Sequence, residues 1–261
     1  MRVDIMIRKL FVIAVLTSSC TLAPPPATTP CNPGLALVNA AAWVRTAAEY
    51  RASSMQTYAV AQRALDAALA TPGDNPPAVI LDLDETAIDN IEFEERMIEQ
   101  GKTYDAAGWT QWVGESASGR TPGAAEFLAY ARSRGVTPFY ITNRKKEDEA
   151  ATRRTLEKLG YPLSAETLLM KTDTSDKGPR RDRVASRYRV LLTFGDDLND
   201  FVTAAGKSLE ERAALVRANA SKWGTSWFIL PNPMYGSWEA TIAGNGTPCE
   251  QLQRKTEALK P

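Results

Sequence analysis

Short apolar runs alternate with amphipathic stretches through most of the chain. The apolar runs are residues 78–81, 136–141 and 189–194. Their length and their β-branched residues favour buried strands over helices. Residues 123–134 and 147–159 favour helices, and the second stretch ends at Gly160 with Pro162 just beyond it, a typical stop signal. This alternation predicts an α/β fold built on a doubly wound parallel sheet.

Two longer stretches lie outside this alternation. Residues 35–70 are rich in Ala, Leu, Gln and Arg and contain no Pro or Gly, which predicts one long helix or two stacked helices. Residues 86–122 are polar and aromatic, and we expect them to form a mainly helical cap inserted after the first strand. A chain of 261 residues that is 44% apolar can form one domain with a large core, which we place at residues 34–261.

The first apolar run ends in the sequence Asp-Leu-Asp-Glu-Thr, which begins at Asp82. A parallel strand delivers its last residues to the carboxyl edge of the sheet, where open α/β folds bind ligands. Two carboxylates, Asp82 and Asp84, at such an edge attract a divalent cation such as Mg²⁺, which prefers oxygen ligands. One carboxylate could then attack phosphorus while the other moves a proton. The alternative is an Asp-rich turn that caps a helix, but the complete motif favours the chemical interpretation.

Two later segments offer groups that could hold a phosphate. Thr142, Asn143 and Arg144 follow the second apolar run and supply a hydroxyl and backbone N–H groups. Lys177 opens a helical stretch and could balance the charge of a phosphoryl group. Taken singly, these segments are also typical of a capped strand end and of a solvated basic helix start.

The third apolar run leads into a second acidic loop. Gly195 allows the turn to pass close to the sheet edge, and Asp196 and Asp200 supply further oxygens for the same cation. A solvated acidic turn is the alternative. This loop is the second most specific signal in the chain.

Taken in order, these motifs resemble those of the haloacid dehalogenase-like (HAD) phosphohydrolases. More narrowly, the chain is similar to the class C bacterial acid phosphatases of HAD subfamily IIIB, which include outer-membrane lipoprotein phosphatases and 5′-nucleotidases. The similarity covers nearly all of the chain from about residue 34 onward. It rests on four segments, DLDET, ITNR, GDDLNDF and LPNPMYGSWE. The resemblance implies a HAD-like Rossmannoid core with a helical cap.

The resemblance also implies roles for single residues. Asp82 would be the nucleophile that forms an aspartyl-phosphate. Asp84 would be the general acid for the leaving alcohol and then the base for water. Thr142 and Lys177 would bind the transferring phosphoryl group.

Mg²⁺ is the cofactor that the resemblance implies. It would lie on Asp82, on the backbone carbonyl of Asp84 and on Asp196, with Asp200 at or near the ion. Sequence spacing alone predicts only an acidic metal site at the edge of an α/β sheet.

Three further residues are candidates for substrate binding. Asn143 lies next to the proposed phosphate site, Trp109 lies in the predicted cap, and Tyr235 lies in the last of the four segments. The fold implied by the resemblance could bring both aromatic rings over the site, where they would stack on a nucleobase. Such stacking accepts any base, so we expect broad use of nucleoside 5′-monophosphates. The alternative is that both rings pack in the core of the cap.

Composition excludes several classes of protein. The chain contains no histidine, which excludes histidine phosphatases, Ser-His-Asp hydrolases and imidazole-bound metals. It carries 31 basic and 31 acidic residues, so no basic field exists to hold nucleic acid.

The amino terminus has the features of an export signal. Residues 1–19 combine a positive start with an apolar stretch too short to span a bilayer, which predicts a secretory signal peptide. Cys20 follows small residues, which favours lipid attachment there over plain secretion. Residues 20–33 are rich in proline and predict an extended tether. If Cys20 carries lipid, Cys31 and Cys249 remain as one candidate disulfide pair in an oxidising compartment. The alternative is two unpaired thiols, which an oxidising compartment outside the cytoplasm disfavours.

These patterns predict an exported, Mg²⁺-dependent phosphomonoesterase that acts on nucleoside monophosphates or similar small esters. We expect it at the outer membrane, held there only by a lipid anchor, or in the periplasm or at the cell surface, with no nucleic-acid partner. One alternative is a phosphotransferase that passes the phosphoryl group to an alcohol. Another is a surface lipoprotein with a vestigial site that only binds ligands. The sequence leaves the oligomeric state open, including a homodimer.

Overall fold

The computed structural model describes residues 31–260. The signal peptide, Cys20 and most of the tether lie outside these residues, so those predictions stay predictions. Within residues 31–260, no helix is both long enough and apolar enough to cross a membrane. Cys31 and Cys249 are both disulfide-bonded, and their pairing with each other stays a prediction.

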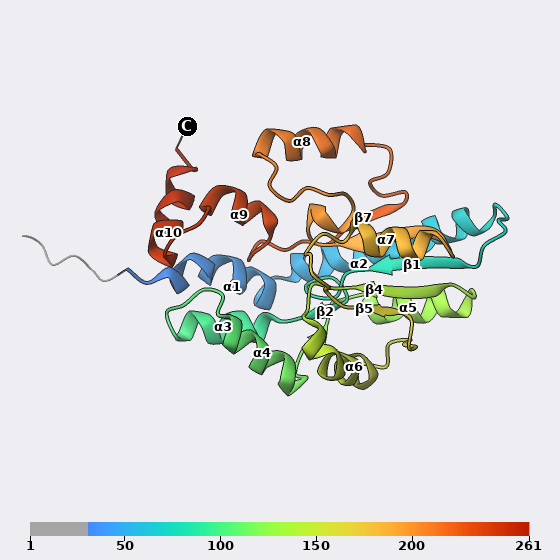
Figure 1. Cartoon of the computed structure of the whole chain (residues 1–261), viewed down its shortest axis with the longest axis horizontal. Helices are drawn as coiled ribbons and strands as arrows, with labels where there is room; N and C mark the ends of the chain where they lie inside the picture. Colours follow the sequence, from blue (N-terminus) through green and yellow to red (C-terminus); the bar gives the residue numbers. More distant parts are fainter. Residues whose placement is uncertain (1–30, 261) are drawn as a thin grey trace, which may run out of the picture. The chain divides into compact units, whose positions relative to one another are not determined.

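A five-stranded parallel sheet forms the centre of the domain, in the order β5-β4-β1-β6-β7 (Figure 1). The strands are β1 (Pro77–Leu81), β4 (Thr137–Ile141), β5 (Leu168–Leu169), β6 (Arg189–Gly195) and β7 (Trp227–Ile229). β1 lies in the middle and pairs Ala78 with Thr137 of β4 and with Val190 of β6. The α/β fold expected from the apolar runs is confirmed. β5 and β7 extend the sheet beyond the three predicted strands.

Helices connect the strands and cover both faces of the sheet. They are α5 (Ala124–Ser133), α6 (Glu149–Lys158), α7 (Gly178–Ala185) and α8 (Leu209–Ala218). A short 3₁₀ turn, η2 (Lys146–Asp148), precedes α6. α5 and α6 match the two predicted helices to within a few residues at each end.

The two faces of β1 explain where its last residue points. Val79 and Leu81 pack into the core formed with α2 (Ala48–Leu69) and α5, whereas Ala78 and Ile80 pack on the side that holds Val184 of α7. Side chains alternate between the two faces of a strand. The next residue, Asp82, therefore emerges on the α7 side at the carboxyl end of β1.

The amino-terminal helical region is broken. It consists of η1 (Pro33–Leu37), α1 (Val38–Thr46) and α2, and Ala47 between the two α-helices is extended, with φ −76° and ψ 129°. Trp43 and Tyr50 contact edge to face across the break, with ring centroids 5.6 Å apart. Of the two forms predicted for residues 35–70, two helices is therefore correct. The first helical turn begins at Pro33, the last residue assigned to the tether.

The cap is inserted between two short antiparallel strands, β2 (Ile88–Asp89) and β3 (Gly119–Arg120). It contains α3 (Ile91–Glu99) and α4 (Ala106–Glu115), which pack around Phe93, Met97 and Trp112. Two carboxyl-terminal helices, α9 (Ser237–Ala243) and α10 (Pro248–Glu257), gather with α1, α3 and α4 at the same end of the sheet (Figure 1). The cap therefore draws on more of the chain than residues 86–122.

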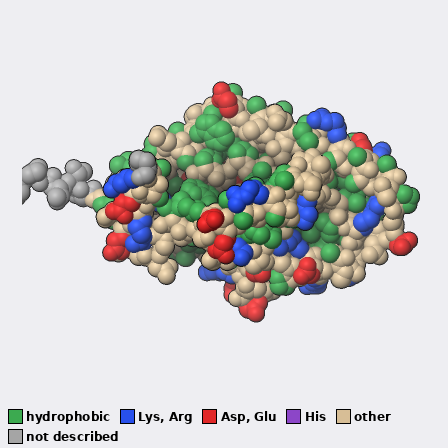
Figure 2. All heavy atoms as spheres, turned by 90° about the horizontal axis from the view of Figure 1, so that it is seen from above, with side chains coloured by type: hydrophobic (Ala, Val, Ile, Leu, Met, Phe, Trp, Pro, Cys, Tyr) green, Lys and Arg blue, Asp and Glu red, His purple; other side chains and the backbone are tan. Residues whose placement is uncertain are grey.

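Charged side chains are intermixed on the face of the molecule shown in Figure 2, where basic and acidic groups lie among apolar patches. No single sign of charge dominates that face.

Candidate active site

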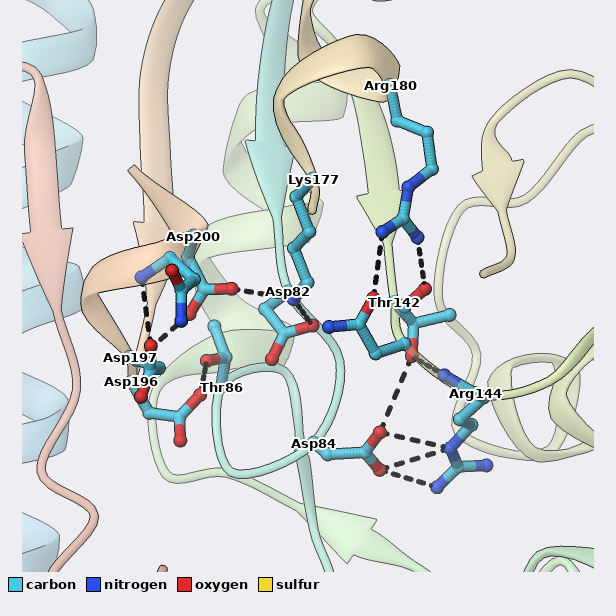
Figure 3. Close-up of polar contacts among 12 residues, drawn as sticks. Asp82, Asp84, Thr86, Thr142, Arg144, Lys177, Arg180, Asp196, Asp197 and Asp200 are labelled. Carbon is cyan, nitrogen blue, oxygen red and sulfur yellow. Dashed lines mark hydrogen bonds and ion pairs between the residues drawn. The ribbon is translucent and has the colours of Figure 1, made fainter. Parts of the chain in front are cut away.

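Three carboxylates meet at the carboxyl edge of the sheet because β1 and β6 are neighbours. Asp82 follows β1, and its N–H donates to the carbonyl of Phe194 in β6 at 3.0 Å. Asp196 and Asp200 come from the loop after β6, which contains the 3₁₀ turn η3 (Leu198–Asp200). Carboxylate oxygens of Asp82, Asp196 and Asp200 lie within 4.8 Å of one another (Figure 3). Asp82 and Asp200 are buried and Asp196 is half-buried.

Lys177 supplies positive charge to this cluster (Figure 3). Its Nζ donates to Oδ1 of Asp82 and, at 2.6 Å, to Oδ1 of Asp200. The lysine stands at the amino end of α7, and the next turn of that helix is tied to the loops on both sides. Arg180 donates to the carbonyl of Thr142 at 2.5 Å, and Arg181 donates to the carbonyl of Asp200 at 3.1 Å. These contacts fix the start of α7 and so place the lysine.

Burial and mutual repulsion shape the electrostatics of the cluster. Burial raises the pKa of Asp82 to about 7, against the opposing effect of Lys177 and with help from Asp200 and Asp84. Burial, followed by the charges of Asp200 and Asp82, raises the pKa of Asp196 well above its usual range. For Lys177, burial alone lowers the pKa, but Asp200 and Asp82 more than offset it, and the net shift is upward.

One lysine cannot balance three carboxylates, so the cluster attracts further positive charge. Carboxylate oxygens are the ligands that hard divalent cations prefer. The residues present therefore fit a divalent metal ion held by Asp82, Asp196 and Asp200.

The Asp84 side chain faces away from this triad. Arg144 binds it with Nη2 2.8 Å from Oδ1 (Figure 3). Asn90 donates to the same oxygen at 2.9 Å. Thr142 is fully buried, and its hydroxyl lies 3.5 Å from Oδ2 of Asp84 while accepting a hydrogen bond from the Arg144 N–H. The carboxylate of Asp84 is thus held in place by three side chains from two segments. The resemblance placed the backbone carbonyl of Asp84 at the metal. The direction of the side chain therefore does not conflict with that expectation.

The turn after Asp84 has an unusual backbone. Glu85 has φ 56°, a left-handed conformation that is uncommon for residues other than glycine. Its side chain is buried and accepts from the Asn90 N–H at 2.9 Å. Burial and the nearby Asp84 and Asp196 raise the pKa of Glu85 well above its usual range, which favours the neutral acid. Backbone strain of this kind persists where the surroundings enforce it, as they do at functional sites.

Two neutral side chains orient Asp196. Thr86 donates to its Oδ1 at 3.1 Å, and Asn232 donates to its Oδ2 at 2.8 Å. At the start of the same loop, a methyl group on Gly195 would overlap the side chain of Asp200. The glycine thus allows the close approach that the sequence pattern predicted.

A cavity of about 750 Å³ opens over these groups. Of the residues predicted for the site, its walls include Asp82, Asp84, Lys177, Asp196, Asp200, Asn143, Trp109 and Tyr235. Trp109 also packs against the cluster of Phe93, Met97 and Trp112, as the alternative interpretation expected. Its stacking on a nucleobase stays a prediction. Its ring centroid lies 5.6 Å from the guanidinium carbon of Arg144. Thr142 lies behind the wall, and its predicted phosphoryl contact stays a prediction.

Sequence reasoning assigned no role to several residues that build the site. Arg144 and Asn232 stood within recognised segments but had no apparent partner, because the groups they bind lie 60 and 36 residues away in the sequence. In the sequence, Arg180 and Arg181 are typical of a basic helix start whose side chains lie in solvent. In the structure, both donate to backbone carbonyls. Their position directly after Lys177 was the only available signal.

Comparison with known proteins agrees with this geometry. The model of the HAD superfamily, subfamily IIIB (acid phosphatase), matches residues 27–238. The chain belongs to this family. Among solved structures it is similar to the class C acid phosphatase from Bacillus anthracis, with 34% sequence identity, a TM-score of 0.85 and coverage of 88% of this chain and 99% of that one. A second structure, of the Bacillus anthracis enzyme with tungstate bound, matches with 34% identity, a TM-score of 0.84 and coverage of 87% and 98%.

This subfamily IIIB acid phosphatase is therefore a phosphomonoester hydrolase. Its carboxylate triad and lysine are assembled at one sheet edge, which removes the reason for considering a vestigial site.

Proposed function

We propose that this acid phosphatase is Mg²⁺-dependent and works through an aspartyl-phosphate on Asp82. The observation that supports the proposal is the buried cluster in which Asp82, Asp196 and Asp200 converge around Lys177. A divalent cation bound there would neutralise charge, so that an anionic phosphate can approach an anionic nucleophile.

The residues of the chain would share two steps. First, an Asp82 carboxylate oxygen forms a bond to phosphorus while the bond from phosphorus to the alcohol oxygen breaks, and Asp84 gives a proton to that oxygen. Water then attacks phosphorus, Asp84 takes its proton, and the bond to Asp82 breaks to release phosphate. Lys177 stabilises the negative charge that the phosphoryl group carries in both steps.

Substitution of the two carboxylates tests these roles. Asp82→Asn should abolish turnover, because an amide does not attack phosphorus. Asp84→Asn should keep the phosphate site yet slow turnover by roughly 10²–10⁴-fold, the usual contribution of general acid–base catalysis. Fluoroberyllate should bind against Asp82 in the wild type. Full activity of Asp82→Asn would exclude the covalent mechanism.

We further propose that nucleoside 5′-monophosphates are substrates. The cavity is larger than a phosphate group requires, and Trp109 and Tyr235 both line it. A base stacked on an aromatic ring gains about 1–3 kcal/mol. Trp109→Ala should therefore lower kcat/KM for a nucleotide about 10-fold while sparing a small aliphatic phosphate. A parallel loss on both substrates, with a lower Tm, would assign Trp109 to the core alone.

We also propose that the enzyme is exported and anchored through lipid on Cys20. The support is the pattern of the first 20 residues. Cys20→Ser should move the protein out of the membrane fraction, and a palmitate analogue should label only the wild type. Absence of label on the wild type would leave plain secretion.

A further inference from the structure

Glu94 is a buried acid that the mechanism does not use. It lies on α3, one residue after Phe93, and only 5% of its surface is exposed. No residue within 31–260 gives it a hydrogen bond or an ion pair. Its carboxyl oxygens are not among the fully shielded polar atoms that lack a partner, because Glu94 borders the cavity.

The free side chain lines the same cavity as the reactive carboxylates. Phe93, its neighbour, meets Trp109 edge to face with centroids 5.0 Å apart. Trp109 lies beside Arg144, which holds Asp84. One continuous wall therefore runs from the proposed proton donor to Glu94. An ester with its phosphate at Asp82 would extend its alcohol part along this wall.

The charge around Glu94 limits what it can bind. Its acidic neighbour Glu239 is already paired with Lys255 at 2.6 Å. Burial, followed by the charge of Glu239, raises the pKa of Glu94 to about 7, so near neutral pH its carboxyl can both donate and accept a hydrogen bond. Among the described residues, Glu94 belongs to no group of acidic side chains close enough to hold a metal ion. A neutral polar group of the substrate matches this site better than a cation.

We propose that Glu94 hydrogen-bonds a hydroxyl group on the alcohol part of the substrate, so that the enzyme favours phosphate esters of sugars and ribosides over those of plain alcohols. This inference rests on the proposed nucleotidase function. It assigns recognition of the sugar to Glu94, whereas recognition of the base is assigned to the aromatic rings.

The test compares adenosine 5′-monophosphate, its 2′,3′-dideoxy analogue and phenyl phosphate. Glu94→Met keeps the length of the side chain but removes hydrogen bonding. It should lower kcat/KM about 10-fold for the riboside and leave the other two substrates within about 2-fold. Glu94→Gln can still donate and accept, so it should retain most of the riboside activity. Glu92→Met, at an exposed position on the same helix, is the matched control and should change none of the three.

Thermal unfolding separates recognition from structure. Because Glu94 has no partner, Glu94→Met should leave Tm unchanged or raise it. Equal losses on all three substrates, or no loss on the riboside, would overturn the proposal. So would a selective loss on phosphocholine, which would assign a cationic group to Glu94. If the wild type cleaves phenyl phosphate but no nucleotide, the nucleotidase proposal fails, and ribose 5-phosphate against phenyl phosphate tests Glu94 by the same comparison.

Discussion

The Arg144 guanidinium binds the Asp84 carboxylate through two nitrogens, with Nη2 2.8 Å and Nε 3.1 Å from Oδ1. The arginine side chain has no exposed surface. A planar donor pair of this kind fixes the orientation of a carboxylate as well as its charge. Arg144 is therefore positioned to hold the proposed proton donor in place.

Replacing Arg144 should affect substrates according to their leaving groups. An alkoxide needs a proton to leave and p-nitrophenolate does not, so Arg144→Met should lose about 10-fold or more on an alkyl phosphate and much less on p-nitrophenyl phosphate. Arg144→Lys keeps the charge but not the two-nitrogen contact, so its activity on the alkyl phosphate should lie between those of the wild type and Arg144→Met. Steady-state kinetics on both esters measure the split. An equal loss on both would show that Arg144 supports the fold rather than Asp84.

Asp196 and Asp197 are adjacent but should differ in their effect on metal binding. Asp196 belongs to the carboxylate triad, whereas Asp197 caps η3 and accepts from the N–H of Ser237 at 2.6 Å. Chelation by EDTA should remove activity and Mg²⁺ should restore it. Asp196→Ala should weaken Mg²⁺ binding strongly, while Asp197→Ala should mainly cost stability, by about 0.5–2 kcal/mol as for other lost caps. Calorimetric titration with Mg²⁺ and thermal unfolding separate the two effects, and equal loss of Mg²⁺ affinity would contradict the assignment.

A single methyl group at Gly195 should disrupt the site. It would overlap Asp200, so Gly195→Ala should displace that carboxylate and lower both Mg²⁺ affinity and kcat. Gly114 in α4 is the matched control, because no heavy atom apart from its chain neighbours and its own helix backbone lies within 4 Å of where its methyl group would be. Gly114→Ala should be tolerated or gain up to about 1 kcal/mol in stability. Normal activity of Gly195→Ala would show that the loop can move away.

Stability of the metal-free protein should fall as the pH rises. Burial raises the folded-state pKa of Asp82 and of Glu94 to about 7 and that of Asp196 well above its usual range. The folded state thus holds protons that the unfolded chain releases near pH 4. The stabilisation is complete below that pH and is lost as the pH rises through the folded-state values.

Unfolding with EDTA between pH 5 and pH 8, roughly the window that these pKa values define, measures this trend. Mg²⁺ competes with protons for the triad, so it should raise Tm more at pH 8 than at pH 5. Asp82→Asn should flatten the pH dependence. A metal-free Tm that rises toward pH 8 would contradict the electrostatic account.

Only the strands of the sheet that have a pattern of their own in the sequence could be predicted. The runs that became β1, β4 and β6 are long enough to show an apolar pattern, and each leads into a polar motif. β5 and β7 have two and three residues, too few to show a pattern, and only pairing with a longer strand makes them strands. No Pro or Gly marks the break at Ala47 in the sequence. The break accompanies the packing of Trp43 on Tyr50, a contact that only the folded structure shows.

The same limit applied to the site. Asp82, Lys177 and Asp196 could be recognised because their motifs are contiguous. The partner of Arg144 could not, because Asp84 lies 60 residues away and the two meet only once β1 and β4 pair. Glu94 reads in the sequence as one more acidic residue on an amphipathic helix, and only its burial in the cavity wall separates it from Glu92.

The pairing of β2 with β3 has a consequence for how this enzyme can change. Ile88 faces Arg120 and Asp89 faces Gly119. Next to this pair, Ser118 donates to Asn90 at 2.7 Å. The chain therefore leaves the catalytic core and returns to it at adjacent positions. The reactive carboxylates all come from segments outside residues 91–117. Exchange of residues 91–117 between relatives would therefore replace the part of the cavity wall that carries Glu94 and Trp109 and leave the reactive carboxylates in place. Tyr235, α9 and α10 would still line the rest of the cavity. Part of the substrate pocket can thus change without any change in the segments that carry the reaction.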